Sequence, residues 1–417
     1  MKLLTGPRKE LLVLWFSWAI ALTLFQSVVV ARFDRKPVDR VLPWTAGETG
    51  KDEADVKARL AVPVFAERVA WDSEFYLSIA QYGYDDPAVR MVHQPGSGSW
   101  SLNYAFMPGY PYTVRIVAAP FVALGARPVT ATVVAALVVS LAGALLAALS
   151  LFEVLSPDEG CSDAVRASWF MLIFPSGFFL AQVYTEGLFL GLALTALAQA
   201  RKGRWTITAL VASLAVLTRA AGVALVPAIA VTAARGLMQE RSRARADGKE
   251  SYRPGFVQLA GIVEAILVPL AVFLVWKFSF LGERFDIVER SFFGRVFAPL
   301  VSIRAWLACF ASILSWPNPR GVYYAIELAA LILALAASLR GVRRYPDLAV
   351  FGLAVLAASV LSVATQGIVR YVLSCPLIFV FLAHKARSSG FERIWVFVSI
   401  LLTGFFALLF SLDMWVA

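Results

Sequence analysis

Apolar stretches long enough to cross a lipid bilayer recur along this chain, and they restrict its fold more than any other feature. A helical span needs roughly 20 apolar residues to cross a hydrocarbon core of about 30 Å, and windows of this kind recur from Leu11 to the C-terminus. The mean hydropathy of +0.72 is well above that of a soluble domain. Because a helix satisfies its own backbone hydrogen bonds in lipid, the sequence predicts an all-α polytopic integral membrane protein.

Short basic clusters separate the apolar stretches and set the predicted orientation, since Lys and Arg favour cytoplasmic loops. The clusters are Lys2, Arg8 and Lys9; Arg201, Lys202 and Arg204; Arg235 to Arg253; Arg340, Arg343 and Arg344; and Lys385, Arg387 and Arg393. Placing them inside puts the N-terminus inside, the C-terminus outside and about eleven spans between. The spans are expected near residues 11–31, 129–153, 164–182, 184–200, 204–218, 220–235, 256–280, 322–340, 347–365, 369–385 and 393–415.

Three further segments complete the predicted topology of a single domain over residues 1–417. The first window is followed by Arg32 instead of a small-residue cleavage site, so we expect a retained helix and not a signal peptide. Residues 32–104 hold nine basic and eleven acidic residues, a net charge of −2, which is typical of an extracytoplasmic loop. The stretches Ala105–Gly125 and Val296–Ser315 each contain an arginine and are expected to be interfacial or re-entrant helices.

The composition argues against several classes of function. Three widely spaced cysteines and two histidines form no recognisable disulfide framework or zinc motif. The net charge of +10 is concentrated between spans, where the orientation of the chain explains it without a nucleic-acid partner. No Gly-rich nucleotide loop occurs, and no internal repeat of the kind that builds many transporters is found.

Asp72 is the first candidate for chemistry. A helical projection of Val64–Tyr84 places it on one stripe with the apolar residues Phe65, Val69, Tyr76 and Ile79, and places the other polar residues opposite. An ionised carboxylate on an apolar face needs a partner or a task. Two interpretations stay open: a functional carboxylate, or a structural ion pair with Arg68 four residues earlier.

Residues further along the chain are expected near the same space. The turn-forming segment Asn103 to Pro111 is predicted to shape a rim of the site or to begin a helix with interfacial tyrosines. A proline-broken stretch ends at Tyr184-Thr185-Glu186 on the predicted outer side. The predicted lining residues are Trp71, Tyr76, Asn103, Tyr104, Tyr184, Glu186 and Tyr371.

Two arginines interrupt apolar segments, and neither is expected to face lipid. Arg219 lies between two apolar half-spans and Arg370 follows Gln366-Gly367 before a late span. Intramembrane arginines usually face a partner or a cavity, and guanidinium grips phosphate through paired hydrogen bonds. The sequence therefore predicts a site for an anionic lipid headgroup. The alternatives are that Arg219 pairs with Glu186 and that Arg370 reaches lipid phosphates at the membrane surface.

Five short motifs follow one another between about residues 65 and 380. They are Trp71-Asp72 with Tyr76 to Ala80 and Gly83-Tyr84; Ala105 to Pro111; Phe174-Pro175-Ser176 with Tyr184-Thr185-Glu186; Thr218 to Gly222; and Arg370-Tyr371 with Pro376-Leu377. In kind and order they resemble the PIG-V type of GPI mannosyltransferase and its prokaryotic relatives, within the GT-C superfamily of membrane glycosyltransferases. This chain departs from the usual pattern with Thr185 for a serine, with Ala221 near an expected asparagine, and with the insert Asp85 to Trp100.

The resemblance implies a GT-C-like bundle that transfers a hexose, typically mannose, from a polyprenyl-phosphate donor to a hydroxyl group on the extracytoplasmic face. Asp72 would be the general base of an inverting reaction, and Arg219 and Arg370 would bind the departing phosphate. The acceptor stays open between a glycan, a lipid and a protein; no cofactor is implied, and a divalent metal is left open. The richness in Ala, Val and Arg favours a prokaryotic cell membrane.

Two other functions stay open from the sequence. A transporter or flippase of a lipid-linked intermediate would also use buried arginines for an anionic cargo, although the long first loop and the lack of inverted repeats argue against it. A non-catalytic subunit of a membrane glycosylation complex would keep the fold without depending on Asp72.

Overall fold

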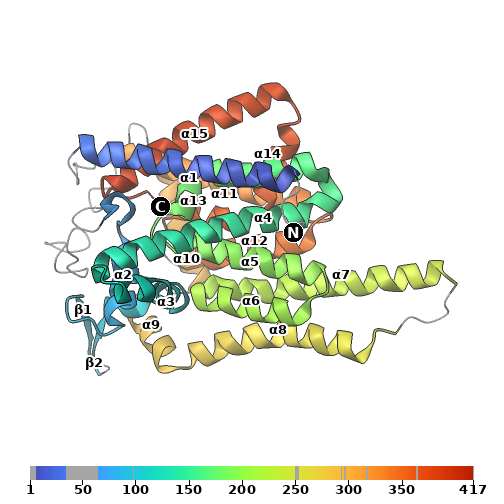
Figure 1. Ribbon diagram of the computed structural model, residues 1–417, viewed down its shortest axis with the longest axis horizontal. Coiled ribbons are helices and arrows are strands. Elements are labelled where there is room, and N and C mark those ends of the chain that lie inside the picture. The colour runs from blue at the N-terminus through green and yellow to red at the C-terminus, as the bar shows by residue number, and fades with distance from the viewer. Residues whose placement is uncertain are drawn as a thin grey trace.

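The computed structural model describes residues 6–33, 64–96, 98–248, 253–292, 294, 297–315, 318–362 and 365–416. This part of the chain is almost entirely helical, and its longest helices run along one common axis (Figure 1). Six helices are long and apolar enough to cross a membrane, or seven spans if one bent pair counts as a span. They are α1 (Gly6–Arg32), α4 (Pro128–Ile173), α7 (Leu225–Ala246) together with the turn Ala220–Ala224 before it, α8 (Phe256–Lys277), α11 (Pro319–Gly341), α15 (Ser389–Ser411) and the bent pair α13 (Ile368–Tyr371) with α14 (Leu377–Lys385).

Shorter helices fill the space between these spans. They are α2 (Asp72–Tyr82), α3 (Gly109–Ala123), α5 (Glu186–Arg201), α6 (Trp205–Thr218), α9 (Phe280–Ser291), α10 (Pro299–Ala311) and α12 (Pro346–Val360). The short 3-10 turns are Ala66–Arg68, Leu102–Ala105, Gly177–Ala181, Ala220–Ala224, Ser312–Leu314 and Val372–Ser374. The strands β1 (Met91–Gln94) and β2 (Gly98–Ser101) pair antiparallel, with Met91 opposite Ser101.

The predicted fold class, an all-α polytopic membrane protein, is confirmed, but the predicted count of about eleven spans is not. Each predicted span contains a helix, yet α5, α6 and α12 have only 16, 14 and 15 residues. The 46 residues of α4 include a break at Gly160, with φ 79° and ψ 165°, which falls between two predicted spans. The stretches expected to be interfacial or re-entrant form α3 and α10, which are too short to count among the six spans.

The two ends of the bundle differ in character. Residues from the predicted extracytoplasmic loop form α2, β1 and β2 at one end, on the left in Figure 1, whereas the described chain begins at the opposite end. Basic residues that the sequence placed on one side meet at that opposite end: Arg8 and Lys202 both pair with Glu153 at 2.7 and 2.5 Å, and Arg201 pairs with Asp347 at 2.7 Å. Residues 34–63 of the predicted loop lie outside the described residues.

Glycines let α4 and α5 pack with their backbones in contact, as small residues do in membrane bundles. A Cβ atom on Gly143 would lie 2.4 Å from the carbonyl carbon of Gly187, and one on Gly187 would lie 2.3 Å from the carbonyl oxygen of Ser140. A Cβ atom on Gly191 would lie 2.6 Å from the carbonyl oxygen of Gly143. This contact fixes the start of α5, and therefore the position of its first residue, Glu186.

Replacing Gly143 by alanine is expected to lower the free energy of unfolding by about 1–3 kcal/mol, because the added methyl group meets backbone that cannot rotate away. Thermal unfolding of the detergent-purified protein measures the effect. Gly236→Ala in α7 is the matched control, since a Cβ there meets nothing within 4 Å. Equal melting temperatures for the two variants would contradict the close α4–α5 contact.

Candidate active site

Four charged side chains from four separate elements meet where α2 faces the bundle; we call Asp72, Glu186, Arg219 and Arg370 the charged quartet. The Nη1 atom of Arg370 lies 3.3 Å from Oδ2 of Asp72, and its Nε atom lies 3.4 Å from Oε1 of Glu186. Arg219 pairs with the same oxygen of Glu186 through Nη1, which also donates to the Thr185 hydroxyl at 3.3 Å. The carboxylates and guanidinium groups therefore alternate in one continuous network.

Breaks in the helices bring these side chains together. Asp72 and Glu186 are the first residues of α2 and α5, where the helix dipole favours negative charge. Arg219 follows the end of α6 with extended backbone angles, φ −150° and ψ 137°. Arg370 belongs to α13, which starts after Gly367 with φ 85°. The arginines thus lie in interruptions between apolar segments, as their sequence positions indicated.

Exposure is unequal across the quartet. The side chains of Arg370 and Glu186 are each 5% exposed, whereas those of Arg219 and Asp72 are 16% and 24% exposed. Two carboxylates balance two guanidinium groups, as buried charges require. The open side of the site is therefore formed by Asp72 and Arg219, and the closed side by Arg370 and Glu186.

Aromatic rings surround the two arginines. The guanidinium carbon of Arg370 lies 5.5 Å from the ring centre of Tyr184 and 5.3 Å from that of Tyr371. Arg219 lies 5.2 Å from the same Tyr371 ring. The buried Tyr76 ring lies 6.1 Å from Tyr184, whose hydroxyl accepts the backbone N–H of Asp72 at 3.3 Å. Such ring faces hold guanidinium groups through cation–π attraction and keep water away from them.

The alternative ion pair between Asp72 and Arg68 does not form. Arg68, the structural alternative, is buried on a separate 3-10 turn and donates to the Ala181 carbonyl at 3.1 Å and to the Thr23 hydroxyl at 2.6 Å. Burial lowers the pKa of Arg68 to about 10 although Glu67 acts in the opposite direction. Asp72 pairs with Arg370 instead.

The continuous helix that placed Asp72 on an apolar stripe does not form. Phe65 and Trp71 have positive φ values of 58° and 55°, so Val64–Tyr84 is divided into a 3-10 turn and α2, which begins at Asp72. The projection over Val64–Tyr84 was therefore wrong for the residues before α2. Such backbone angles are rare outside glycine and mark sites that their surroundings fix.

Two predicted lining residues, Asn103 and Tyr104, form their described hydrogen bonds with α2 and the residues after it, and not with the quartet. The Asn103 amide donates to the Ser78 hydroxyl at 2.9 Å and to the Gly83 carbonyl at 3.2 Å, and the Tyr104 hydroxyl donates to Asp85 at 2.9 Å. Burial and this bond raise the pKa of Tyr104 above its usual value. These residues hold the start of the insert Asp85 to Trp100.

Trp71 also points away from the quartet, toward the C-terminal residues. Its indole N–H donates to the Met414 carbonyl at 3.3 Å, and its ring meets Trp415 edge-on at 5.1 Å. The structure bears on the alternatives for the two arginines: Arg219 does pair with Glu186, whereas Arg370 is buried and pairs with Asp72 and Glu186. One further residue beside the site, Glu327, is absent from the residues predicted from the sequence.

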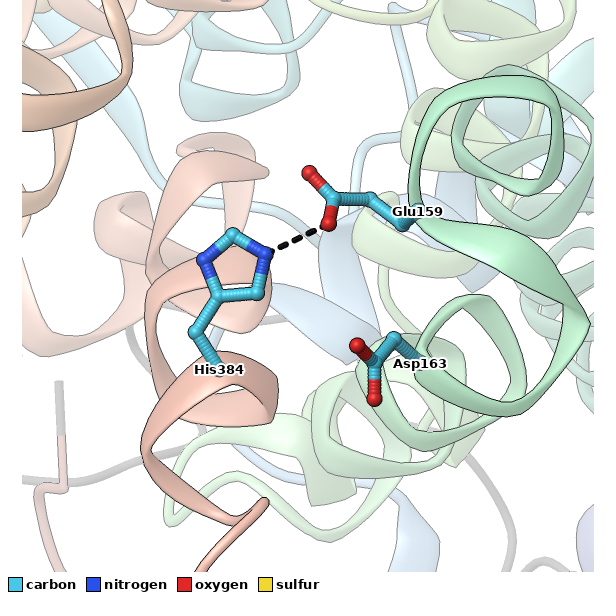
Figure 2. Close-up of side chains that lie close together, drawn as sticks. All are labelled: Glu159, Asp163 and His384. Carbon is cyan, nitrogen blue, oxygen red and sulfur yellow. Dashed lines mark hydrogen bonds and ion pairs between the residues drawn. The ribbon is translucent and has the colours of Figure 1, made fainter.

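The candidate metal ligands among the described residues lie at the other end of the bundle. Figure 2 shows Glu159, Asp163 and His384, whose ligand atoms lie within 4.8 Å of one another. His384 contacts Glu159 at 2.6 Å, Arg344 pairs with Glu159 at 3.2 Å, and Arg387 pairs with Asp163 at 2.6 Å. A metal ion would have to compete with these two arginines, so the arrangement is better suited to an ion-pair cluster.

Solved structures with a similar arrangement include an archaeal oligosaccharyltransferase and ArnT, but the likeness is low. The archaeal oligosaccharyltransferase AglB from Archaeoglobus fulgidus, in complex with an inhibitory peptide and a dolichol-phosphate, has 14% identity and a TM-score of 0.39 over 96% of this chain and 55% of that one. ArnT from Cupriavidus metallidurans bound to undecaprenyl phosphate has 12% identity and a TM-score of 0.45 over 89% of this chain and 62% of that one. This chain therefore spans less than two thirds of the length of either protein.

Sequence comparison gives a more specific result. No curated protein matches the chain. Residues 53–246 match the model of the family described as mannosyltransferase (PIG-V). That range contains Asp72, Glu186 and Arg219, whereas Arg370 lies beyond it. The segment that carries three members of the charged quartet thus matches the PIG-V mannosyltransferase family, as the motifs predicted.

Proposed function

We propose that this chain transfers mannose from a polyprenyl-phosphate donor to an acceptor hydroxyl group outside the cytoplasm, with inversion at the anomeric carbon. The PIG-V match and the helical membrane fold support the coarser statement, a membrane glycosyltransferase. The observation that carries the finer proposal is the charged quartet, in which a partly exposed carboxylate lies beside two arginines.

Asp72 is the general base in this proposal. Its Oδ2 atom pairs with Arg370, whereas its Oδ1 atom makes no hydrogen bond to any residue that the structure describes. That oxygen is therefore free to accept the proton of a hydroxyl group as the hydroxyl oxygen attacks the anomeric carbon. The proton moves to the carboxylate while the bond between the sugar and the phosphate breaks.

Arg219 and Arg370 stabilise the phosphate that departs. Arg219 uses only its Nη1 atom for Glu186 and Thr185, and its Nε and Nη2 atoms have no hydrogen-bond partner among the described residues. Those N–H groups are available for phosphate oxygens, which guanidinium binds through paired, charge-assisted bonds. Glu186 contacts both guanidinium groups and so fixes their separation. The N–H groups of the two arginines are therefore already oriented to stabilise the negative charge that develops on the leaving phosphate.

The proposed location follows from the charge distribution. The basic clusters gather at the end of the bundle opposite α2, and positively charged loops favour the cytoplasm. The quartet would then lie near the extracytoplasmic surface, within reach of a lipid-linked donor in the bilayer. We propose a prokaryotic cell membrane, and an acceptor among glycans, lipids or proteins.

The test uses purified protein in proteoliposomes with radiolabelled polyprenyl-phosphate mannose and membrane extract as the source of acceptors. We expect a mannosylated product from this donor, little from the matched glucose donor and none from GDP-mannose. Product from GDP-mannose alone would overturn the donor class. Movement of the donor lipid across the membrane without product would favour a transporter, and activity that appears only with a second protein would favour a subunit.

A further inference from the structure

Glu327 is a fully buried acidic residue in the transmembrane helix α11. The proposed reaction assigns it no role. Its side chain is 0% exposed. Oε1 accepts the Tyr323 hydroxyl at 2.6 Å and the backbone N–H of Gly367 at 2.8 Å, and Oε2 accepts the backbone N–H of Val369 at 2.9 Å. A buried carboxylate is costly unless donors surround it, and here three donors do.

These bonds hold the segment that carries Arg370. Helix α13 has only four residues, Ile368–Tyr371, and is followed by a sharp bend of 85° before α14. A helix this short has too few internal hydrogen bonds to be stable alone. The Glu327 carboxylate binds backbone N–H groups on both sides of its first residue. The direction in which Arg370 leaves the backbone therefore depends on Glu327.

A second connection runs from Glu327 toward Asp72. The Tyr323 hydroxyl, which donates to Glu327, lies 3.3 Å from the indole N–H of Trp415 and accepts it. The Trp415 ring meets the Trp71 ring edge-on at 5.1 Å. Trp71 precedes Asp72 and has unusual backbone angles, φ 55° and ψ −116°, which tertiary contacts must maintain.

We infer that Glu327 is a positioning residue, which fixes α13 and the Trp415–Trp71 contact so that Arg370 and Asp72 face each other. It touches neither substrate nor the reacting atoms. The inference deepens the proposed function and rests on it for the activity measurements. The position of α13 can be measured independently of any activity.

Hydrogen exchange of the purified protein tests the structural part. In Glu327→Gln the amide protons of residues 366–371 are expected to exchange at least about 10-fold faster, because an amide offers one acceptor oxygen in place of two. Exchange in α4 and α5 should stay unchanged. Ser338→Ala is the control, since Ser338 is buried in the same helix and its hydroxyl has no hydrogen-bond partner in the described structure. Unchanged exchange at residues 366–371, or faster exchange throughout, would overturn the inference.

Kinetics test the functional part. Glu327→Gln is expected to lower kcat by about 10- to 100-fold, since a displaced Arg370 stabilises the transition state poorly, while the donor KM changes only by about threefold or less. Tyr323→Phe should act in the same direction with a smaller effect, and Ser338→Ala should match the wild type. In an Arg370→Lys background, Glu327→Gln should add little, because both changes affect one interaction. Full additivity would mean that Glu327 acts elsewhere.

The positioning role of Glu327 and the proposed function can be contradicted independently of each other. If the wild type transfers no mannose, the proposed function is wrong, and hydrogen exchange still decides whether Glu327 holds α13. If the wild type is active and the exchange at residues 366–371 does not change in Glu327→Gln, the positioning role is wrong and the proposed function stands. Should Glu327→Gln fail to fold, Tyr323→Phe supplies both measurements.

Discussion

Asparagine in place of Asp72 is expected to lower mannosyl transfer by about 10²- to 10⁴-fold, the range that a general base contributes. The amide has nearly the same shape and can still contact Arg370, but it cannot take a proton from the acceptor hydroxyl. Because Asp72 is the most exposed member of the charged quartet, the variant should fold and insert normally. The rate of product formation at saturating donor measures the effect.

Glu74→Gln provides the matched control, because it removes the same charge from the same turn of α2. It should retain most of the wild-type rate. Asp72→Glu should retain a small fraction of activity, since the carboxylate is kept but displaced by one methylene group. Mannosyl transfer by Asp72→Asn at the wild-type rate would exclude Asp72 as the general base. Glu186, the other carboxylate of the charged quartet, would then be the next candidate.

Alanine in place of Arg370 is expected to damage both stability and activity. The substitution leaves Asp72 and Glu186 with less compensation in a buried setting, and breaking a buried ion pair in this way typically costs about 3–5 kcal/mol. Mannosyl transfer should fall by about 10²- to 10³-fold, because a hydrogen-bond donor for the negative charge that develops on the phosphate is lost. Thermal unfolding and transfer are measured on the same preparation.

The double variant Arg370→Ala/Asp72→Asn separates these two effects. It should regain part of the lost stability, because the unpaired carboxylate is gone, but none of the lost transfer. Arg387→Ala is the control arginine, since it also pairs with acidic residues but lies exposed at the opposite end of the bundle. Wild-type stability of Arg370→Ala would contradict the buried ion pairs of Arg370 with Asp72 and Glu186.

The residues that the sequence identified well are those whose chemistry conflicts with an apolar setting. Arg219 and Arg370 interrupt hydrophobic stretches, and the energy of an unpaired charge in lipid predicts that both must find partners. The identity of those partners depends on contacts between distant elements: Arg370 meets Asp72 across 298 positions of sequence. The sequence therefore predicted a shared site, but it left each individual pairing open.

Other features depended on local backbone geometry that hydrophobic patterns do not report. The positive φ values at Phe65 and Trp71 divide a segment whose composition resembles one amphipathic helix. Glu327 was available as an acidic residue inside an apolar stretch, but its role depends on a turn 40 residues later. Asn103 and Tyr104 begin the turn-forming segment Asn103 to Pro111, yet their hydrogen bonds go to α2, to Gly83 and to the first residue of the insert.

The shortness of α6 bears on the lipid around the protein. Its 14 residues extend about 21 Å at 1.5 Å per residue, which is less than a hydrocarbon core of about 30 Å. One face of this helix is exposed and carries Ile207, Leu210 and Leu214. Arg219 follows the last residue of the helix. Such hydrophobic mismatch is relieved when the bilayer thins locally. We expect the headgroup plane to dip toward Arg219, so that a lipid phosphate meets the guanidinium group while its chain stays in the membrane.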